Sequence, residues 1–182
     1  MRIVTIALAA ALAPLWAQEI KLPASLEKLA AKAEDTVDIR LDGTMLRLAG
    51  RFLSDKDGDE AAAKKLLAGL QSITVRSFQF AREGEYSTAD VDEVRAQVKA
   101  APWSRIVGVT SKRDGDNVDV YFKDGGNGQL GGILLICAEP RELTIVSIAG
   151  TLDPAQLADL GGQFGIPRLD VDLSVLGRKG AK

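Results

Sequence analysis

The chain has 182 residues, with 23 lysines and arginines against 25 aspartates and glutamates, so it has no excess of basic residues with which to bind nucleic acid or an anionic membrane. It contains no histidine, which excludes histidine-based acid–base catalysis, Ser-His and Cys-His nucleophile pairs and nearly all zinc sites. Its single cysteine, Cys137, excludes an internal disulfide, and 46% hydrophobic with 26% charged residues is typical of a globular protein.

The N-terminus has the pattern of a secretory signal peptide. Met1-Arg2 gives a positive start, an apolar run extends from Ile3 to Ala13, and Ala17 supplies the small residue before a cleavage point. The run of about 11 residues is too short to span a bilayer, which takes about 20. We therefore expect cleavage between Ala17 and Gln18 and a periplasmic or secreted protein. An uncleaved interfacial anchor or a buried N-terminal helix is the alternative.

Residues 18–182 are long enough for one domain, and hydrophobic periodicity predicts its first elements. The strand over 36–42 should bury Val37, Ile39 and Leu41 and expose the polar residues between them. In the strand over 72–80 the apolar phase slips, which predicts a β-bulge near Arg76-Ser77. The full set is a helix over 23–33, the strand over 36–42, a helix over 45–53, a helix from a cap at Asp59 to about Leu70, and the strand over 72–80.

The second half begins with a strong helix signal. Ser87 and Asp90 form a capping box, Tyr86 can pack on Val91, and Pro102 ends the element. Turn-forming residues then separate four strands, which predicts an antiparallel meander. These strands are expected at about 104–112, 117–123, 130–138 and 142–149, and Asp153-Pro154 begins a last helix.

Together these elements predict an α+β fold, a largely antiparallel sheet of about six strands with helices packed on one face. The strand over 130–138 is apolar at nearly every position, so we expect it to be central and buried on both faces. Cys137 lies in this strand, where it is expected to act as a small hydrophobic residue. The tail after residue 168 is expected to be loose.

Two acidic loops offer oxygen atoms to a cation, but each has a simpler explanation. Asp55, Asp57 and Asp59 alternate like the start of a calcium loop, yet the required Gly and Glu positions hold Glu60 and Leu66. The run Asp114-Gly115-Asp116-Asn117 is what a hairpin turn needs in any case. The glycine-rich segment 125–132 precedes a strand and lacks the Lys-Ser/Thr of a phosphate loop.

Carboxylate chemistry would depend on residues that meet in space, and Glu139 and Glu142, which flank a turn, are the pair most worth inspecting. No convincing Ser-x-x-Lys motif is present. The sequence therefore predicts no catalytic residue, no cofactor site and no metal site.

Several stretches together resemble one known family. They are VDIRLDGTMLRLAGRFL (37–53), GEYSTADVDEV (84–94), NVDVYF (117–122), CAEPRELTIVSIAG (137–150) and LADLGGQFGIP (157–167). They are similar to the bacterial envelope proteins of domain-of-unknown-function family 4252. The resemblance implies an exported α+β domain without an established activity, and a link to extracytoplasmic sigma factors and their regulators. Family members often look like lipoproteins, whereas this chain lacks a cysteine at the cleavage point.

The leading hypothesis is a non-enzymatic binding module of the bacterial envelope with a protein partner. The alternatives are a carrier of a small apolar ligand held between sheet and helices, and a hydrolase that does not use histidine.

Overall fold

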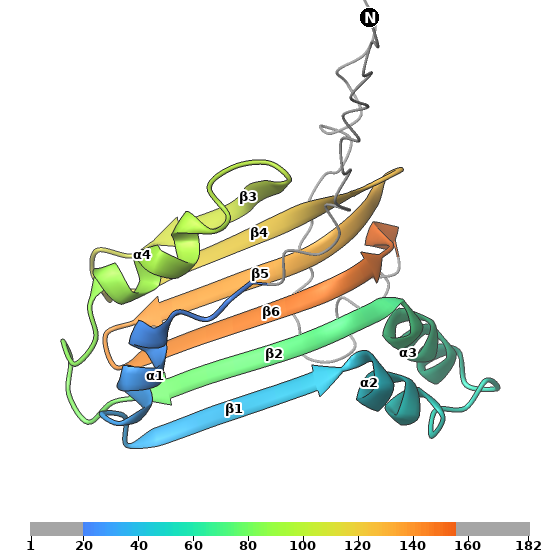
Figure 1. Cartoon of the computed structure of the whole chain (residues 1–182), viewed down its shortest axis with the longest axis horizontal. Coiled ribbons are helices and arrows are strands. Elements are labelled where there is room, and N and C mark those ends of the chain that lie inside the picture. Colours follow the sequence, from blue (N-terminus) through green and yellow to red (C-terminus); the bar gives the residue numbers. More distant parts are fainter. Residues whose placement is uncertain (1–19, 156–182) are drawn as a thin grey trace, which may run out of the picture.

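The computed structural model describes residues 20–155, which form a six-stranded antiparallel sheet and four helices (Figure 1). The predicted α+β fold is confirmed. The helices are α1 (Ala24–Ala30), α2 (Gly43–Gly50), α3 (Gly58–Gly69) and α4 (Thr88–Ala96). The strands are β1 (Asp35–Asp42), β2 (Leu70–Gln79), β3 (Trp103–Thr110), β4 (Asn117–Gly126), β5 (Gln129–Glu139) and β6 (Glu142–Leu152).

The strand order is β1-β2-β6-β5-β4-β3, and every neighbouring pair is antiparallel. The last four strands form the predicted meander, and β6 pairs with β2, which joins the meander to β1 and β2 in one sheet. As expected for residues 130–138, β5 lies in the middle of the sheet. The strand is not buried on both faces, however. Leu134 and Ile136 are fully buried, whereas Leu135 and Cys137, which point the other way, are half-buried.

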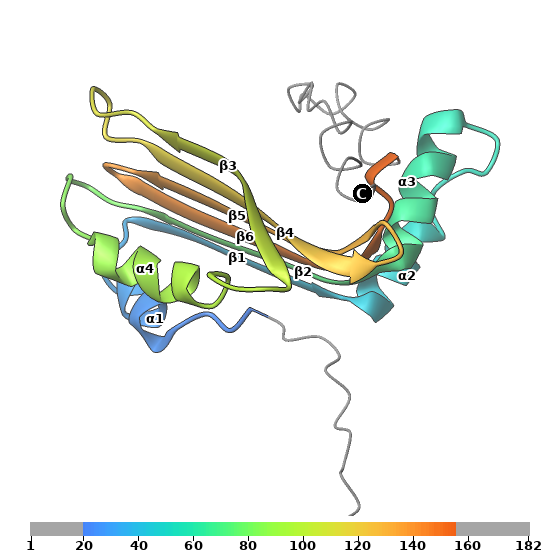
Figure 2. The same cartoon turned by 90° about the horizontal axis from the view of Figure 1, so that it is seen from above.

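The main core lies on one face of the sheet, beneath α1 and α4 (Figure 2). Helical side chains such as Leu26 and Val94 meet strand side chains such as Phe78, Ile136 and Leu143, and all five are fully shielded from solvent. Burial of such side chains is the main source of stability in a chain that has no disulfide.

A smaller core lies on the opposite face, at one end of the sheet. Leu46 of α2 packs there with Leu70 and Leu152, together with half-buried residues of α3 and the strands. The prediction that all helices pack on one face was therefore wrong. The reason is that β2 and β6 end in apolar residues at this end, and α2 and α3 are the helices that cover them (Figure 2).

Side-chain caps start three of the helices. Asp42 caps α2 by accepting hydrogen bonds from the backbone N–H groups of Thr44 and Met45. The predicted capping box of Ser87 and Asp90 is confirmed at α4. The predicted cap of α3 was wrong by two residues, because Asp57 is the residue that accepts from the first turn.

The predicted β-bulge at Arg76-Ser77 was also wrong. Strand β2 pairs in continuous register through both residues with β1 and β6, and its irregularity lies at Leu70–Ser72. The apolar phase slips for another reason. Phe78 faces the core beneath α1 and α4, whereas Ile73 faces the smaller core of α2 and α3. Each half of the strand is apolar on the face that a helix covers.

Pro154 and Ala155 begin a helical turn in which Asp153 accepts a hydrogen bond from the N–H of Ala155 at 2.9 Å. The rest of the predicted last helix, the tail and the N-terminal apolar segment lie outside the described residues. Within residues 20–155 no helix is long and apolar enough to cross a membrane.

Candidate functional site

The most distinctive surface of the molecule is the part of the sheet that faces away from α1 and α4. Successive side chains of a strand point to opposite faces, and residues paired in register share a face. Because Leu143 and Ile145 lie in the main core, their neighbours Thr144 and Val146 face the other way. The pairing in register then identifies the residues of all six strands whose side chains lie on this same face.

This surface is almost entirely apolar. Among residues 20–155, α2 and α3 cover it only at one end, and no helix lies over the remainder (Figure 2). Val37, Ile39 and Val109 at its two edges are 45%, 43% and 52% exposed. We call this surface the open face, and it consists of Val37, Ile39, Val75, Val107, Val109, Val118, Val120, Leu135, Cys137 and Val146, with Ser77 and Thr144 as its polar members.

The direction of β1 is held by a charge cluster on the other face. Arg76 is buried, with 4% of its side chain exposed, and it pairs with Asp38 of β1 and with Glu27 of α1. Because Asp38 points towards α1, Val37 and Ile39 must point to the open face. The prediction that these apolar residues would be buried was wrong for this reason, whereas Asp38 is exposed as predicted.

At one end the open face is bounded by carboxylates. Asp35, Glu139 and Glu142 lie in one row with Gln79, directly beyond the row of Ser77 and Thr144, and we call this row the acidic rim. The candidate pair Glu139 and Glu142 thus meets as cross-strand partners. Glu142 accepts hydrogen bonds from the hydroxyls of Ser77 and Thr144, which is a structural role.

Cys137 lies on the open face next to the acidic rim. Burial raises the pKa of its thiol, and the nearby negative charges of Glu139 and Glu142 raise it further. A thiol whose pKa is raised is a poor nucleophile at neutral pH. This raised pKa agrees with the role of a small hydrophobic residue that the sequence context of Cys137 predicts.

The opposite end of the open face, where α2 and α3 lie, carries charges of both signs. From Gly43 to Leu53, which covers α2 and the turn after it, the charged side chains are Arg47 and Arg51, and both are exposed. Phe52, next to Arg51, is 83% exposed. Asp42 caps α2, and the segment that leads into α3 is rich in aspartate. The open face thus lies between an acidic rim at one end and two helices of mixed charge at the other.

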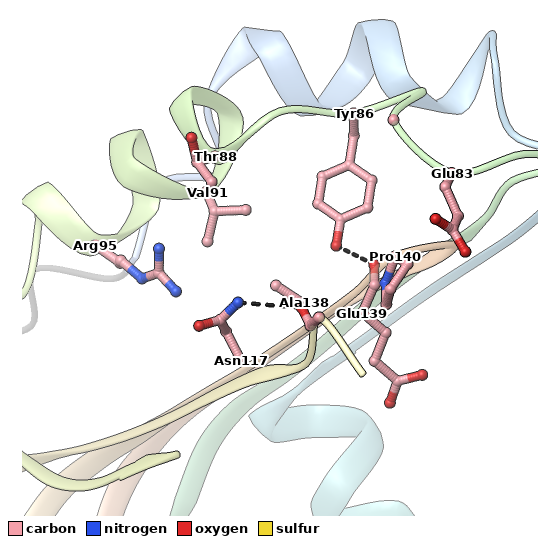
Figure 3. A pocket seen from close by; sticks show the side chains of 11 residues that line it. Glu83, Tyr86, Thr88, Val91, Arg95, Asn117, Ala138, Glu139 and Pro140 are labelled. Atoms are coloured by element: carbon pink, nitrogen blue, oxygen red, sulfur yellow. Dashed lines mark hydrogen bonds between the residues drawn. The ribbon is translucent and has the colours of Figure 1, made fainter. Parts of the chain in front are cut away.

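A second candidate is a cavity of about 260 Å³ beneath α4. Figure 3 shows its polar side chains, with Arg95 from α4 and Asn117 from β4 on one side and Tyr86 on the other. Val91 and Ala138 supply apolar surface. Its size would suit a small polar molecule.

Tyr86 and Arg95, two of the polar residues that line this cavity, are already engaged with the protein. The hydroxyl of Tyr86 donates to the backbone carbonyls of Glu139 and Glu142, and burial raises the pKa of Tyr86 to about 12. Burial lowers the pKa of Arg95, but hydrogen bonds from its guanidinium to Asp119 and Asp92 outweigh this effect and leave the pKa raised. The cavity therefore presents a neutralised arginine and a protonated tyrosine.

The acidic loops found in the sequence have structural partners. Asp55 pairs with Lys64 at 2.8 Å and Asp57 caps α3. Asp114 accepts a hydrogen bond from the hydroxyl of Ser111 within the β3–β4 hairpin. Among residues 20–155, no group of three or more acidic or cysteine side chains is arranged to hold a metal ion. Segment 125–132 forms a hairpin, with Gly126, Asn127 and Gly128 at positive φ.

Sequence reasoning missed both surfaces, although one signal was present. Apolar residues occupy both alternating positions over much of β4 and β5, for example Leu134 and Leu135. Such a run indicates burial on both faces or an uncovered apolar face, and the prediction for residues 130–138 followed the first alternative. The cavity has no sequence signal, because its polar residues come from four separate segments.

No curated protein and no solved structure shows a significant match to the chain. The model of the domain of unknown function DUF4252 matches residues 29–160, which include all of the sheet and α2, α3 and α4. This match agrees with the motifs that carried the resemblance. The chain belongs to the DUF4252 family of domains of unknown function.

Proposed function

We propose that this protein is an exported, non-enzymatic binding module of the bacterial envelope, and that it binds a protein partner through its open face. The observation that carries the proposal is the apolar surface that crosses all six strands without a charged side chain. Soluble monomers rarely leave an apolar patch of this extent in water, and larger patches mark sites of protein or membrane contact.

The cluster around Arg76 supports the same reading. A slip of β1 by one residue would place Val37 and Ile39 beneath α1 and would move Asp38 to the open face, away from Arg76. The observed register instead keeps two exposed apolar side chains at the edge of the open face. Such an arrangement costs hydration free energy in the isolated chain, and a bound partner would recover it.

A non-enzymatic role is consistent with the chemistry of the cavity. A general base must be able to accept a proton near neutral pH, and Tyr86 with a pKa of about 12 holds its proton. Arg95 is neutralised by two aspartates, so it offers little net charge to an anionic substrate.

Site-specific photo-cross-linking in cells that export the protein tests the proposal. A photoreactive residue at Ile39 or Val75 on the open face should give a discrete protein adduct. The same residue at Ala96, which is exposed on α4, is the matched control and should give none. Equal labelling from both surfaces, or no protein adduct from the open face, would contradict the proposal.

A carrier of a small apolar ligand is the second candidate, because the open face would equally shelter an acyl chain. The cavity beneath α4 has several polar side chains in its lining, and the core beside it is filled by fully buried side chains such as Phe78 and Phe80, so an apolar ligand would lie on the open face. Native mass spectrometry of the purified protein separates the two candidates. A retained apolar adduct that is lost in Val146→Lys would favour the carrier.

A further inference from the structure

We propose that residues 157–176 of this chain cover the open face in the isolated protein, and that a partner has to displace them. This inference rests on the proposed function, because it names what competes with the partner for the same surface. Three observations lead to it, namely the width of the face, the point at which the chain leaves the sheet, and the apolar pattern of the sequence that follows.

The open face has the dimensions of a single covering segment. Its side chains form two rows across all six strands, one from Val37 to Val109 and the other from Ile39 to Val107. Six strands about 4.8 Å apart make each row about 24 Å long, and the two rows lie about 7 Å apart. A helix is about 10–12 Å wide, so one segment that crosses the strands would shelter both rows.

The chain leaves the sheet beside this face. Strand β6 is the third strand of the sheet and runs from the acidic rim at Glu142 towards the end where α2 and α3 lie. Its last residue, Leu152, is 1% exposed and lies in the smaller core with Leu46 of α2, on the same side of the sheet as the open face. The described residues end shortly afterwards, at Ala155, so the sequence that follows starts at the border of the open face.

Strand β1 shows where a chain that leaves this end of the sheet can go. Because β1 and β6 both pair antiparallel with β2, they run in the same direction. After β1, Gly43-Thr44 begin α2, and Leu46 of that helix packs on the side of the open face. Near the end of β6, Gly150-Thr151 precede Asp153, which accepts a hydrogen bond from the N–H of Ala155 in a first helical turn. The two strands thus continue in a similar way.

The sequence after Ala155 has the apolar residues that a cover requires. Leu157, Leu160 and Phe164 recur at helical spacing. Beyond Pro167 the pattern changes to alternation, with Leu169, Val171, Leu173 and Val175 between Asp170, Asp172 and Ser174. Each part offers an apolar side to the open face and a polar side to water. Because β6 lies within about 15 Å of both edges of the sheet, ten residues suffice to reach either edge even as a helix.

Cys137 is a native probe of the cover, since it is the single cysteine and lies on the open face. The experiment measures the rate at which a thiol reagent modifies Cys137 in the purified protein. Leu160→Asp places a charge in the proposed contact, so it should release the cover and raise the labelling rate by about tenfold or more. The matched control Ala155→Asp adds the same charge at an exposed position and should leave the rate within about twofold. Circular dichroism establishes that both variants are folded.

Intramolecular cross-linking locates the covering residues without a substitution among them. A photoreactive residue at Val75, in the middle of the open face, should react within its own chain, and mass spectrometry of the digest should place the adduct in residues 157–176. The product should have the mass of a monomer at every protein concentration. The same photoreactive residue at Ala96, exposed on α4 on the other side of the sheet, should not reach this segment.

The cover and the partner exclude one another, so releasing the cover should favour the partner. The apparent affinity for the partner is reduced by the fraction of chains in which the face is open. In cells, Leu160→Asp should therefore increase the yield of the protein adduct from Ile39 by about threefold or more relative to Ala155→Asp.

Rapid labelling of Cys137 in the unsubstituted chain that Leu160→Asp does not increase, or a digest without an adduct between Val75 and residues 157–176, would overturn the proposal. Protection of Cys137 that grows with protein concentration would also overturn it, because copies of the chain would then cover one another. If Val75 reacts with no part of its own chain but captures a protein in cells, the proposed function stands and the cover is wrong. If the internal adduct forms and no protein is captured even with Leu160→Asp, the cover stands and the proposed function is wrong.

Discussion

Replacing Arg76 should cost less stability than removing one of the carboxylates that neutralise it. The guanidinium is 4% exposed, whereas Asp38 and Glu27 keep 40% and 59% of their side chains in water. The Nε atom of Arg76 has no hydrogen-bond partner within residues 20–155, so part of its desolvation is not compensated. In Arg76→Met the two carboxylates rehydrate and an apolar chain fills the space, so we expect a change in the free energy of unfolding within about 1 kcal/mol.

Asp38→Ala should be more destabilising than Arg76→Met, because the buried charge of Arg76 remains and loses one of its two partners. Leaving a buried charge without compensation costs about 3–5 kcal/mol, and with Glu27 still in place we expect about half of that, roughly 2 kcal/mol. For a protein of this size the corresponding fall in Tm is about 4–8 °C.

Urea unfolding of both variants provides the measurement, with Arg40→Met as the control. Arg40 pairs with the same two carboxylates but is 62% exposed, so its loss should cost less than about 0.5 kcal/mol. If Arg76→Met proved more destabilising than Asp38→Ala, the ion cluster would be a net source of stability, and the reasoning above would be refuted.

Two further substitutions test the cavity and the irregular pairing of β2. Burial raises the pKa of Tyr86 to about 12, from about 10 in the unfolded chain, so this group stabilises the fold below pH 10 and the contribution is lost as the pH rises towards 12. Tyr86→Phe should therefore reduce the loss of stability at alkaline pH, and it should lower the free energy of unfolding at pH 7 by about 1 kcal/mol. Urea unfolding at pH 7 and at alkaline pH measures both effects. Gly150 has φ of +147°, and a Cβ there would lie 2.5 Å from the carbonyl oxygen of Gly69 and 2.6 Å from Cα of Leu70, so Gly150→Ala should cost about 2 kcal/mol or more. Gly58→Ala, at a position with open space, should be tolerated, and equal losses for the two glycines would contradict the argument.

Local signals in the sequence predicted most of the elements because their causes are local. The capping box at Ser87 and Asp90 and the hairpins between β3 and β6 depend on residues a few positions apart. The cap of α3 was misplaced because Asp57 and Asp59 carry the same chemistry two residues apart. Only the geometry of the turn at Gly58 decides between them.

The errors in β1 and β2 share a cause that is not local. Both predictions assumed that apolar side chains mark one buried face along the whole strand. In the structure Arg76 is buried by charge partners from α1 and β1, which are 49 and 38 residues away in the chain. Arg76 therefore explains why β1 has the opposite orientation to the one predicted, and why the apolar pattern of β2 resembled that of a bulge.

The same arginine links the fold to the proposed function. Val37 and Ile39 are each over 40% exposed in the observed register. If a well-packed apolar core were the only requirement, burying these two side chains beneath α1 in place of Asp38 would stabilise the fold more. Arg76 prevents that register, because a slipped β1 would leave its buried charge with Glu27 alone. The cluster thus extends the open face to the outermost strand instead of strengthening the core. Arg76→Met, if it is as stable as expected, would remove this constraint on register, and it should then weaken association through the open face although Arg76 lies on the opposite side of the sheet.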